Sequence, residues 1–390
     1  MDKSFKSILI AGLVTVFMGS CANSQNVCSY QLDAKKFDTV INKKPVHLFT
    51  MKNKNGMEVS ITNFGGRIVQ IIIPDKNGNK QDVVLGYDNI QQYYDIEKYG
   101  GSDFGAAIGR YANRINKGQI TIGGKQIQLP QNNFGHCLHG GPNGWQYAIY
   151  DGKKENDSTI TMSIVSPDGD ANFPGKVEAK VTYTLTSTNA LDIQYEATTD
   201  AETVINMTNH SYFNLNGDPT KNIENCILYV NADCMTPVNR TFMTTGEIVK
   251  MAEDDPFNFL KPKAVGKDIN ADNEQLKFGM GYDHNWCLNT YKDGVGNDKE
   301  IAASLWSPIT GIRLDVYTNE PGIQVYTGNF LDGTAKGKKG IIYNRRAAIC
   351  LETQKYPDTP NKPNWPTANL KPGETYKSHC VFAFSVSKGL

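Results

Sequence analysis

One histidine and one glutamate, far apart in the chain, are the residues best suited to carry chemistry. His210 lies in the polar and aromatic run Asn206–Leu215, whose sequence is NMTNHSYFNL. Glu352 directly follows the apolar run Ala347–Leu351. An acid and a base of different types, in a chain without a phosphate-binding loop, suit proton transfer on a neutral molecule. A sugar is the class of substrate that fits this combination.

His210 is the candidate acid, because an imidazole gains and loses a proton near neutral pH. The alternative is a buried histidine that only satisfies backbone groups, but the neighbouring Asn209, Ser211 and Tyr212 favour a functional site. Glu352 is the candidate base. A carboxylate at the end of an apolar strand is partly desolvated, and desolvation raises its pKa. The alternative is an exposed glutamate at a strand end.

Other polar residues have the side chains needed to bind hydroxyl groups. Asn113 and Arg114 place a carboxamide beside a guanidinium; the alternative, which this segment alone favours, is a salt bridge within a loop. Asp283 lies among aromatic residues, which suggests a carboxylate that grips hydroxyls beside an aromatic surface; the alternative is an aspartate that forms a turn. His139 precedes two glycines, which let a backbone approach a ligand closely.

A metal site is a weaker interpretation of the histidines. His136 and His139 are three residues apart, but they have no third ligand nearby and no helix to align them. His47 and His379 lie in strand-like surroundings without a polar cluster, so we expect them to be structural.

Strands must position these side chains, because short alternating runs separated by turn residues follow one another from about Val46 onward. The expected strands are 58–62, 67–73, 119–122, 126–129, 158–165, 177–186, 190–198, 301–306 and 312–318. Only Asn89–Tyr94 has the pattern of a short helix. The sequence therefore predicts an all-β protein, a large antiparallel β-sandwich, with one domain over residues 45–390.

Composition excludes several classes of partner. The chain has 390 residues, with 40 Lys+Arg against 40 Asp+Glu, so its formal charge is zero. Nothing in this balance steers the protein toward nucleic acid or an anionic membrane surface.

The first 20 residues resemble a lipoprotein signal peptide. Lys3 and Lys6 precede an apolar stretch over 8–18, and Gly19 and Ser20 lead directly to Cys21. A short basic region, a short apolar core and a small-residue site predict export, and the stretch is too short for an ordinary membrane span. We expect Cys21 to be lipidated and residues 21–44 to act as a tether. The alternative is an ordinary signal peptide with an incidental cysteine.

Seven further cysteines leave the disulfides open. They form no C-x-x-C pair, and several lie in apolar runs, which favours buried, unpaired thiols. One or two disulfides remain an alternative for an exported protein. These cysteines are Cys28, Cys137, Cys226, Cys234, Cys287, Cys350 and Cys380.

Together these segments resemble the aldose 1-epimerase family, the galactose mutarotases, from about residue 45 to residue 388. The segments that carry the resemblance, in family order, are 104–118, 138–141, 166–169, 206–217, 281–288, 320–333 and 351–358. The resemblance implies the family's large β-sandwich, the galactose mutarotase-like supersandwich. It also implies interconversion of the α and β anomers of free aldoses such as glucose and galactose, without a cofactor or a metal.

The resemblance assigns a role to seven residues. By matching motif, Glu352 corresponds to the catalytic base and His210 to the catalytic acid. The residues that correspond to sugar-binding positions are Asn113, Arg114, His139, Asp283 and Gln324.

Three positions depart from the family's pattern. Trp145 stands where a phenylalanine is common, Tyr150 stands where a tryptophan is common, and Thr244 replaces the proline of a Pro-Thr-Gly-Glu motif. We expect the first two to alter a wall near the cleft and hence the preferred sugar.

Two other functions would use many of the same residues. A glycoside hydrolase would use Glu352 and Asp283 as its pair of carboxylates. A non-catalytic sugar-binding lipoprotein would need neither Glu352 nor His210. For the epimerase we expect a small aldose as the substrate, a monomer or weak dimer, and membrane contact only through the lipid, in the periplasm or at the cell surface.

Overall fold

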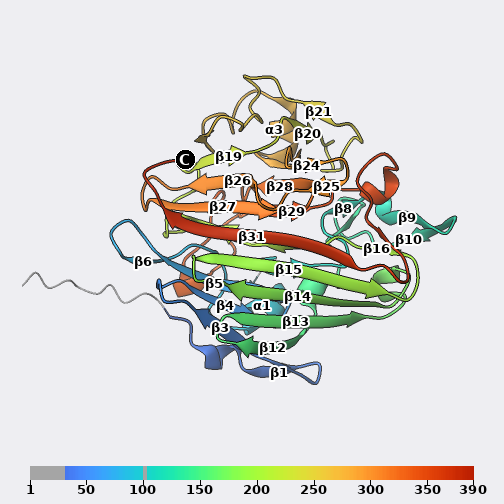
Figure 1. The fold of residues 1–390 in the computed structure, drawn as a ribbon, viewed down its shortest axis with the longest axis horizontal. Coiled ribbons are helices and arrows are strands. Elements are labelled where there is room, and N and C mark those ends of the chain that lie inside the picture. The colour runs from blue at the N-terminus through green and yellow to red at the C-terminus, as the bar shows by residue number, and fades with distance from the viewer. Residues whose placement is uncertain (1–30, 100–102) are drawn as a thin grey trace, which may run out of the picture.

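Antiparallel strands form most of the regular structure in the computed structural model, which describes residues 31–99 and 103–390 (Figure 1). The largest sheet has nine strands. In sheet order they are β12 (Asp151–Asn156), β13 (Thr159–Ser166), β14 (Val177–Leu185), β15 (Ala190–Thr199), β31 (Tyr376–Val386), β27 (Ile312–Thr318), β26 (Ile301–Trp306), β19 (Ile227–Val230) and β22 (Lys263–Ala264). Figure 1 shows β31, β15, β14, β13 and β12 as consecutive strands across the molecule.

Two smaller sheets complete the sandwich. The six-stranded sheet has the order β18 (Tyr212–Phe213), β29 (Ile349–Gln354), β28 (Gly322–Tyr326), β23 (Asp283–Cys287), β20 (Cys234–Thr236) and β21 (Val249–Lys250). The four-stranded sheet has the order β3 (Leu48–Lys52), β4 (Glu58–Thr62), β5 (Arg67–Pro74) and β6 (Lys80–Asp82).

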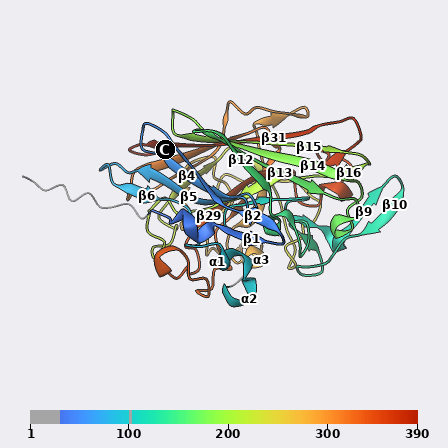
Figure 2. The same cartoon turned by 90° about the horizontal axis from the view of Figure 1, so that it is seen from below.

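Short strand pairs and helices connect the sheets. The pairs are β1 (Thr39–Ile41) with β2 (Lys44–Val46), β7 (Ala106–Ile108) with β17 (Thr208–His210), β8 (Arg114–Ile115) with β11 (Cys137–Leu138), β9 (Gln119–Ile122) with β10 (Lys125–Gln128), β16 (Thr203–Val204) with β30 (Asn369–Leu370), and β24 (Tyr291–Lys292) with β25 (Val295–Gly296). The helices are α1 (Gln91–Tyr94), α2 (Ile96–Tyr99) and α3 (Glu274–Gly279), with 3₁₀ turns at Ala34–Phe37, Asn116–Gly118, Trp145–Tyr147, Asp170–Asn172, Lys338–Gly340 and Thr359–Asn361. The β9–β10 hairpin projects from one end of the sandwich, and α1 and α2 lie below the sheets (Figure 2).

Alternation along the strands creates the core. In β14, Val177, Val181 and Leu185 are buried while Glu178 and Lys180 face water. One apolar cluster joins the inward residues of all three sheets, so the sandwich encloses a single main core. The prediction of an all-β antiparallel fold is confirmed, and the expected strands lie within two residues of the observed ones.

The packed part of the chain begins before residue 45. Residues 21–44 were expected to be a tether, but Phe37 is fully buried and the backbone carbonyl of Lys36 accepts a hydrogen bond from the N–H of Ile90. The expected signal peptide and Cys21 lie outside the described residues. Over the described ranges, no helix is both long and apolar enough to cross a membrane.

The cysteines in the described part of the chain are unpaired. Cys137, Cys226, Cys287, Cys350 and Cys380 are buried, which confirms the interpretation of these residues as small apolar side chains. Cys234 is partly exposed and is also a free thiol. Cys28 lies outside the described residues, so any bond that it forms stays a prediction.

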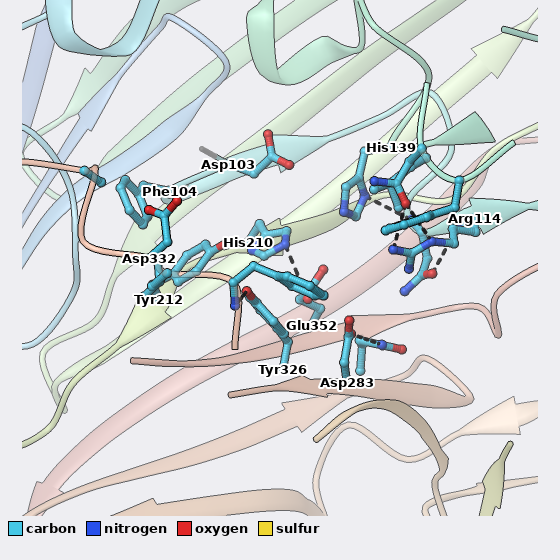
Figure 3. Close-up of a pocket in the computed structure, with 18 of the residues that line it drawn as sticks. Asp103, Phe104, Arg114, His139, His210, Tyr212, Asp283, Tyr326, Asp332 and Glu352 are labelled. Atoms are coloured by element: carbon cyan, nitrogen blue, oxygen red, sulfur yellow. Dashed lines mark hydrogen bonds and ion pairs between the residues drawn. The ribbon is translucent and has the colours of Figure 1, made fainter. Parts of the chain in front are cut away.

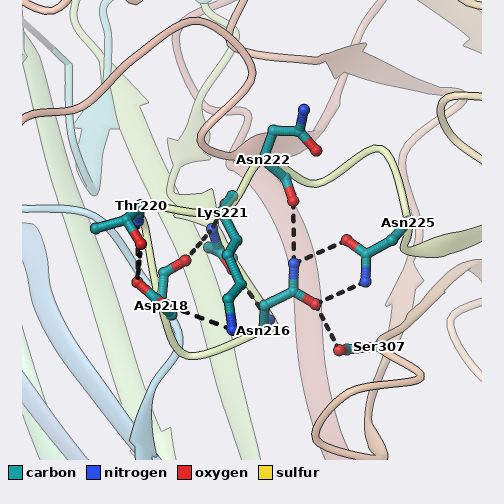
Figure 4. Close-up of polar contacts among 8 residues, drawn as sticks. Asn216, Asp218, Thr220, Lys221, Asn222, Asn225 and Ser307 are labelled. Atoms are coloured by element: carbon teal, nitrogen blue, oxygen red, sulfur yellow. Dashed lines mark hydrogen bonds and ion pairs between the residues drawn. The ribbon is translucent and has the colours of Figure 1, made fainter.

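A polar network fixes the connection between β18 and β19 (Figure 4). The buried carboxamide of Asn216 donates to the carbonyl of Asn222 and to the side chain of Asn225, and accepts from the hydroxyl of Ser307 at 2.7 Å. A buried amide that uses both its donors and its acceptor stabilises one loop conformation. Since β18 carries Tyr212, this network helps to hold one wall of the cavity described below.

His379 has a polar cluster that the sequence did not indicate. Its Nε2 lies 3.0 Å from Asp192 on β15, and its Nδ1 lies 2.8 Å from Asp298 in the loop before β26. Two carboxylates require both ring nitrogens to be donors, which is the protonated form. Hydrogen bonding to Asp192 outweighs partial burial and, with Asp298, raises the pKa of His379 to about 9. The expectation of a structural role stands, but that of surroundings without polar groups was wrong.

We predict that His379→Gln is more destabilising at pH 6 than at pH 10. The pKa of His379 is raised above its unfolded value of about 6.5, so its stabilising effect is complete below that pH and is lost as pH rises through about 9. Because the cluster is partly solvated, the expected difference in the free energy of unfolding is about 1–2 kcal/mol, measured by urea denaturation at both pH values. His47→Gln, at an exposed contact with Asp38, is the control. An equal loss at both pH values for His379→Gln would contradict the assignment.

Candidate active site

Three neighbouring strands place Glu352, Gln324 and Asp283 on one face of the six-stranded sheet. Glu352 on β29 lies directly opposite Gln324 on β28. Gln324 lies opposite Asn285 on β23, and Asp283 precedes Asn285 by two residues, so it points to the same side. The Nε2 of Gln324 donates a hydrogen bond of 2.8 Å to Oδ1 of Asp283. Asp283 and Glu352 thus share one surface, although 69 positions separate them in the sequence.

The opposite face of the same strands belongs to the core. Ile349 and Leu351 of β29, and Ile323 and Val325 of β28, are buried in the main apolar cluster. All six residues of β29 are therefore buried, although only one side of the strand is apolar. The alternation that anchors Leu351 in the core also directs Glu352 toward the cavity.

His210 faces Glu352 from β17, a separate strand paired with β7. Its Nε2 lies 3.6 Å from Oε1 of Glu352, and both side chains are almost completely buried. The imidazole ring stacks on Tyr212 at 5.0 Å and 16°, and meets the ring of His139 edge-on at 5.3 Å. These two ring contacts limit how far the imidazole can rotate.

His139 presents a donor to the cavity. The backbone N–H of Asn113 donates a hydrogen bond of 3.1 Å to Nδ1 of His139, so the neutral ring carries its hydrogen on Nε2. His139 has a φ of 52°, and the following Gly140 has a φ of 78°. A Cβ at Gly140 would lie 2.3 Å from the carbonyl oxygen of Gly109, so only glycine fits this close approach.

Asn133 holds the guanidinium of Arg114. The Nε and Nη2 of Arg114 donate to Oδ1 of Asn133 at 3.2 and 3.0 Å. The guanidinium carbon also lies 5.1 Å from the centre of the Phe242 ring, a cation–π contact. Arg114 therefore keeps its remaining donors in a fixed direction.

All seven residues singled out from the sequence line one cavity of about 380 Å³ (Figure 3). Aromatic side chains form part of its wall, namely Phe104, Phe134, Tyr212, Tyr326 and Phe330. In Figure 3 the side chains of Asp103, His139, His210, Glu352 and Asp283 surround a shared space. Polar groups on an aromatic background are what a sugar requires, since its hydroxyls need partners and its C–H face needs an apolar surface.

Burial shifts the proton affinities of the facing pair in opposite directions. Burial raises the pKa of Glu352 well above its usual range, and the carboxylates of Asp283 and Asp103 raise it further, against the lowering effect of Arg114. Burial lowers the pKa of His210, and Asp103 partly offsets that change. Burial therefore makes the carboxyl group of Glu352 a weaker acid and the imidazole of His210 a weaker base than the same groups in water.

Several polar atoms in the cavity have no hydrogen-bond partner among the described residues. They include Oε2 of Glu352, Nδ1 of His210 and Oε1 of Gln324, all shielded from solvent. A buried polar atom without a partner is energetically unfavourable, so these atoms are suited to bind hydroxyls of a ligand.

Two expectations about aromatic residues were wrong. Tyr282 and Trp286, near Asp283, belong to the main core and do not line the cavity. Trp145 and Tyr150, which we expected at a wall near the cleft, are also core residues that do not line it. Trp145 packs so closely on Gly109 that a Cβ there would lie 2.1 Å from the indole ring. Trp145 and Tyr150 therefore support the strands behind the cavity.

The structure adds residues that the sequence did not indicate. Asp103, Asn133, Tyr326 and Phe330 line the cavity, but no local pattern distinguishes them. His136, by contrast, does not line it: its Nδ1 accepts from the N–H of Lys117 and its Nε2 lies 2.9 Å from the hydroxyl of Thr241. His136 and His139 thus do not converge on a common site.

Comparisons with known proteins agree with this geometry. The sequence profile described as aldose 1-epimerase matches residues 47–383. A galactose mutarotase from Sus scrofa is 40% identical over 332 residues, covering 85% of this chain and 92% of the relative. An aldose 1-epimerase from Escherichia coli is 35% identical over 344 residues, covering 87% and 96%.

Solved structures show the same fold. An aldose epimerase homologue from C. elegans superposes with a TM-score of 0.79 at 31% identity, covering 88% of this chain and 99% of the homologue. A galactose 1-epimerase from Lactobacillus acidophilus gives a TM-score of 0.76 at 27% identity, covering 90% and 97%.

We predict that Gly140→Ala destabilises the protein more than Gly123→Ala does. Both glycines have positive φ values, 78° and 56°, so an added Cβ costs about 1 kcal/mol of backbone strain at either position. Only at Gly140 does the Cβ also meet a backbone oxygen, whereas nothing lies within 4 Å at Gly123. We expect losses of about 2–3 and about 1 kcal/mol in the free energy of unfolding, measured by urea denaturation. Equal losses would mean that the loop before Trp145 adapts freely.

Proposed function

The chain belongs to the aldose 1-epimerase family, and from that premise we propose that Glu352 and His210 are its catalytic base and acid. The reaction is the interconversion of the α and β anomers of free aldoses such as glucose and galactose. The observation that carries the residue assignment is the separation of 3.6 Å between Nε2 of His210 and Oε1 of Glu352 at the wall of a shared cavity.

The reaction needs two proton transfers and one rotation. Glu352 takes the proton of the anomeric hydroxyl while His210 gives a proton to the ring oxygen, and the bond between C1 and the ring oxygen breaks. The product is an open-chain aldehyde. After rotation about the C1–C2 bond, the hydroxyl formed from the ring oxygen attacks the other face of the aldehyde. His210 takes its proton back from this hydroxyl, and Glu352 returns its proton to the new anomeric oxygen.

The opposite pKa shifts support this exchange of roles. Each group must be an acid in one half of the reaction and a base in the other, so neither can hold the proton much more strongly than its partner. Burial raises the pKa of Glu352 and lowers that of His210, so the carboxylate binds a proton more readily and the imidazolium releases one more readily than in water. These are the proton transfers that ring opening requires.

The remaining polar residues would hold the sugar while its ring is open. Arg114 and the Nε2–H of His139 are donors to hydroxyls, and Asp283 is an acceptor. Gln324 and Asn113 extend the polar wall. Fixed contacts to the hydroxyls away from C1 would keep the aldehyde and the attacking hydroxyl near each other, which favours reclosure over loss of the substrate.

We predict that Glu352→Gln lowers kcat by about 10²–10⁴-fold with little change in sugar binding, since glutamine keeps the shape but cannot take the proton. Polarimetry on freshly dissolved α-D-glucose and α-D-galactose, corrected for the spontaneous rate, measures turnover, and calorimetry measures binding. Glu178→Gln, exposed on the outer face of β14, is the matched control. Near-normal turnover by Glu352→Gln would refute the assignment of the base.

The N-terminus supports a further part of the proposal, that the enzyme is an exported lipoprotein. Residues 1–20 would be removed, Cys21 would carry the lipid, and the epimerase domain would work as a monomer or weak dimer in the periplasm or at the cell surface. There it would equilibrate the anomers of sugars before their uptake. The basis is the order of basic, apolar and small residues before Cys21.

We predict that Cys21→Ala abolishes incorporation of a fatty-acid analogue and moves the protein from the membrane fraction to the soluble fraction. Cys28→Ala, a substitution of the same type seven residues later, should leave both unchanged. The measurement is labelling and fractionation of cells that express the full chain. If Cys21→Ala remains labelled and membrane-bound, the lipidation proposal is wrong.

A further inference from the structure

Asp103 lies at the wall of the cavity beside His210 and His139, and no role has yet been given to it. Polar atoms of these three side chains all lie within 4.8 Å of one another (Figure 3). Asp103 is thus close to the acid of the proposed reaction, and a bound sugar must approach its carboxylate.

The carboxylate of Asp103 has no cationic partner within the described ranges. Its Oδ1 is shielded from solvent and lacks a hydrogen bond, and it forms no ion pair there. The ring of His139 beside it does not compensate it, because burial lowers the pKa of His139 well below its ordinary value. Asp103 is half-buried, so its carboxylate can accept a cationic group of a ligand that lies next to it.

Asp283 provides the contrast within the same cavity. Its Oδ1 accepts a hydrogen bond from Gln324, and although burial raises its pKa, the guanidinium of Arg114 and this hydrogen bond oppose the rise. Arg114 acts in the same direction on Glu352. The positive charge of the cavity therefore acts on Asp283 and Glu352, and Asp103 is left for the ligand to neutralise.

We propose that Asp103 is a specificity-determining residue that favours aldoses with a protonated amino group and disfavours aldoses with an anionic group. This inference rests on the proposed function and names a substrate class for the same cavity. In a pyranose, a substituent on C6 is two bonds from C5, the ring carbon bonded to the ring oxygen, and a substituent on C2 is two bonds from the reacting C1. Because His210 protonates the ring oxygen in the proposed reaction and Asp103 lies beside His210, a charged group on C6 comes near Asp103. An ammonium group would pair with the carboxylate, whereas a carboxylate or phosphate would be repelled.

The experiment compares sugars of different charge on the full chain and on Asp103→Asn, which keeps the shape and removes the charge. The substrates are D-glucose, 2-amino-2-deoxy-D-glucose, 6-amino-6-deoxy-D-glucose and D-glucuronate. Polarimetry near pH 6.5 measures the rate of anomer exchange for each sugar, corrected for the spontaneous rate. Asp332→Asn is the matched control, because Asp332 also lines the cavity but is exposed at its rim.

We expect Asp103→Asn to lower kcat/KM for at least one amino sugar relative to glucose by about tenfold, and to raise the relative value for glucuronate. Asp332→Asn should change these ratios less than twofold. If Asp103→Asn changes all four sugars by the same factor, Asp103 acts through His210 and the proposal is wrong. Unchanged ratios would also overturn it.

Binding measurements test the role of Asp103 independently of the proposed epimerase activity. Calorimetry with the same sugars on Glu352→Gln measures affinity without turnover, so the charge preference can be tested whether or not glucose is epimerised. A tighter affinity for an amino sugar than for glucose, lost when Asp103→Asn is added, supports the role of Asp103. Equal affinities for the amino sugars and glucose contradict it. Absence of glucose turnover by the unaltered chain would count against the proposed function alone.

Discussion

The close approach of His210 to Glu352 in a desolvated wall is the constraint on which the site depends. At 3.6 Å the two groups are near enough to act on adjacent oxygens of one hemiacetal, and burial raises the pKa of Glu352 and lowers that of His210. Either effect alone would be insufficient. An exposed pair at this distance would keep an ordinary gap in pKa, and a buried pair far apart could not act on one substrate.

The register between β28 and β29 makes this approach possible. Glu352 faces the cavity because Leu351 faces the core, and Gln324 lies opposite Glu352 because Val325 lies opposite Leu351. A shift of one residue in this pairing would bury Glu352 in the apolar core and direct Leu351 toward the sugar. The packing that stabilises the sandwich therefore also determines the orientation of the catalytic side chains, so the core and the site impose the same register.

The sequence could predict what local patterns encode. Alternation located the strands, and the polar surroundings of His210 favoured a functional site. The run before Glu352 taken alone favours an exposed glutamate, and the family resemblance assigned its role. Alternation also explains the errors at Tyr282 and Trp286: a residue one or three positions from Asp283 points to the opposite face of the strand. The roles of Asp103 and of the partners of His379 depend on segments that meet only in the folded chain, so no local pattern could reveal them.

Asp103 and Asp283, two of the three aspartates that line the cavity, differ in a way that follows from their positions in the fold. Asp283 lies within a sheet, where neighbouring strands supply Gln324 as a fixed partner. Asp103 precedes β7 at the edge of the cavity, beside His139, whose pKa burial lowers well below its ordinary value. A sheet can satisfy its own polar side chains through cross-strand neighbours, whereas a residue at a loop end depends on what binds next to it. Variation at such loop-end positions can therefore change which sugar is preferred without disturbing the register that orients the acid and the base.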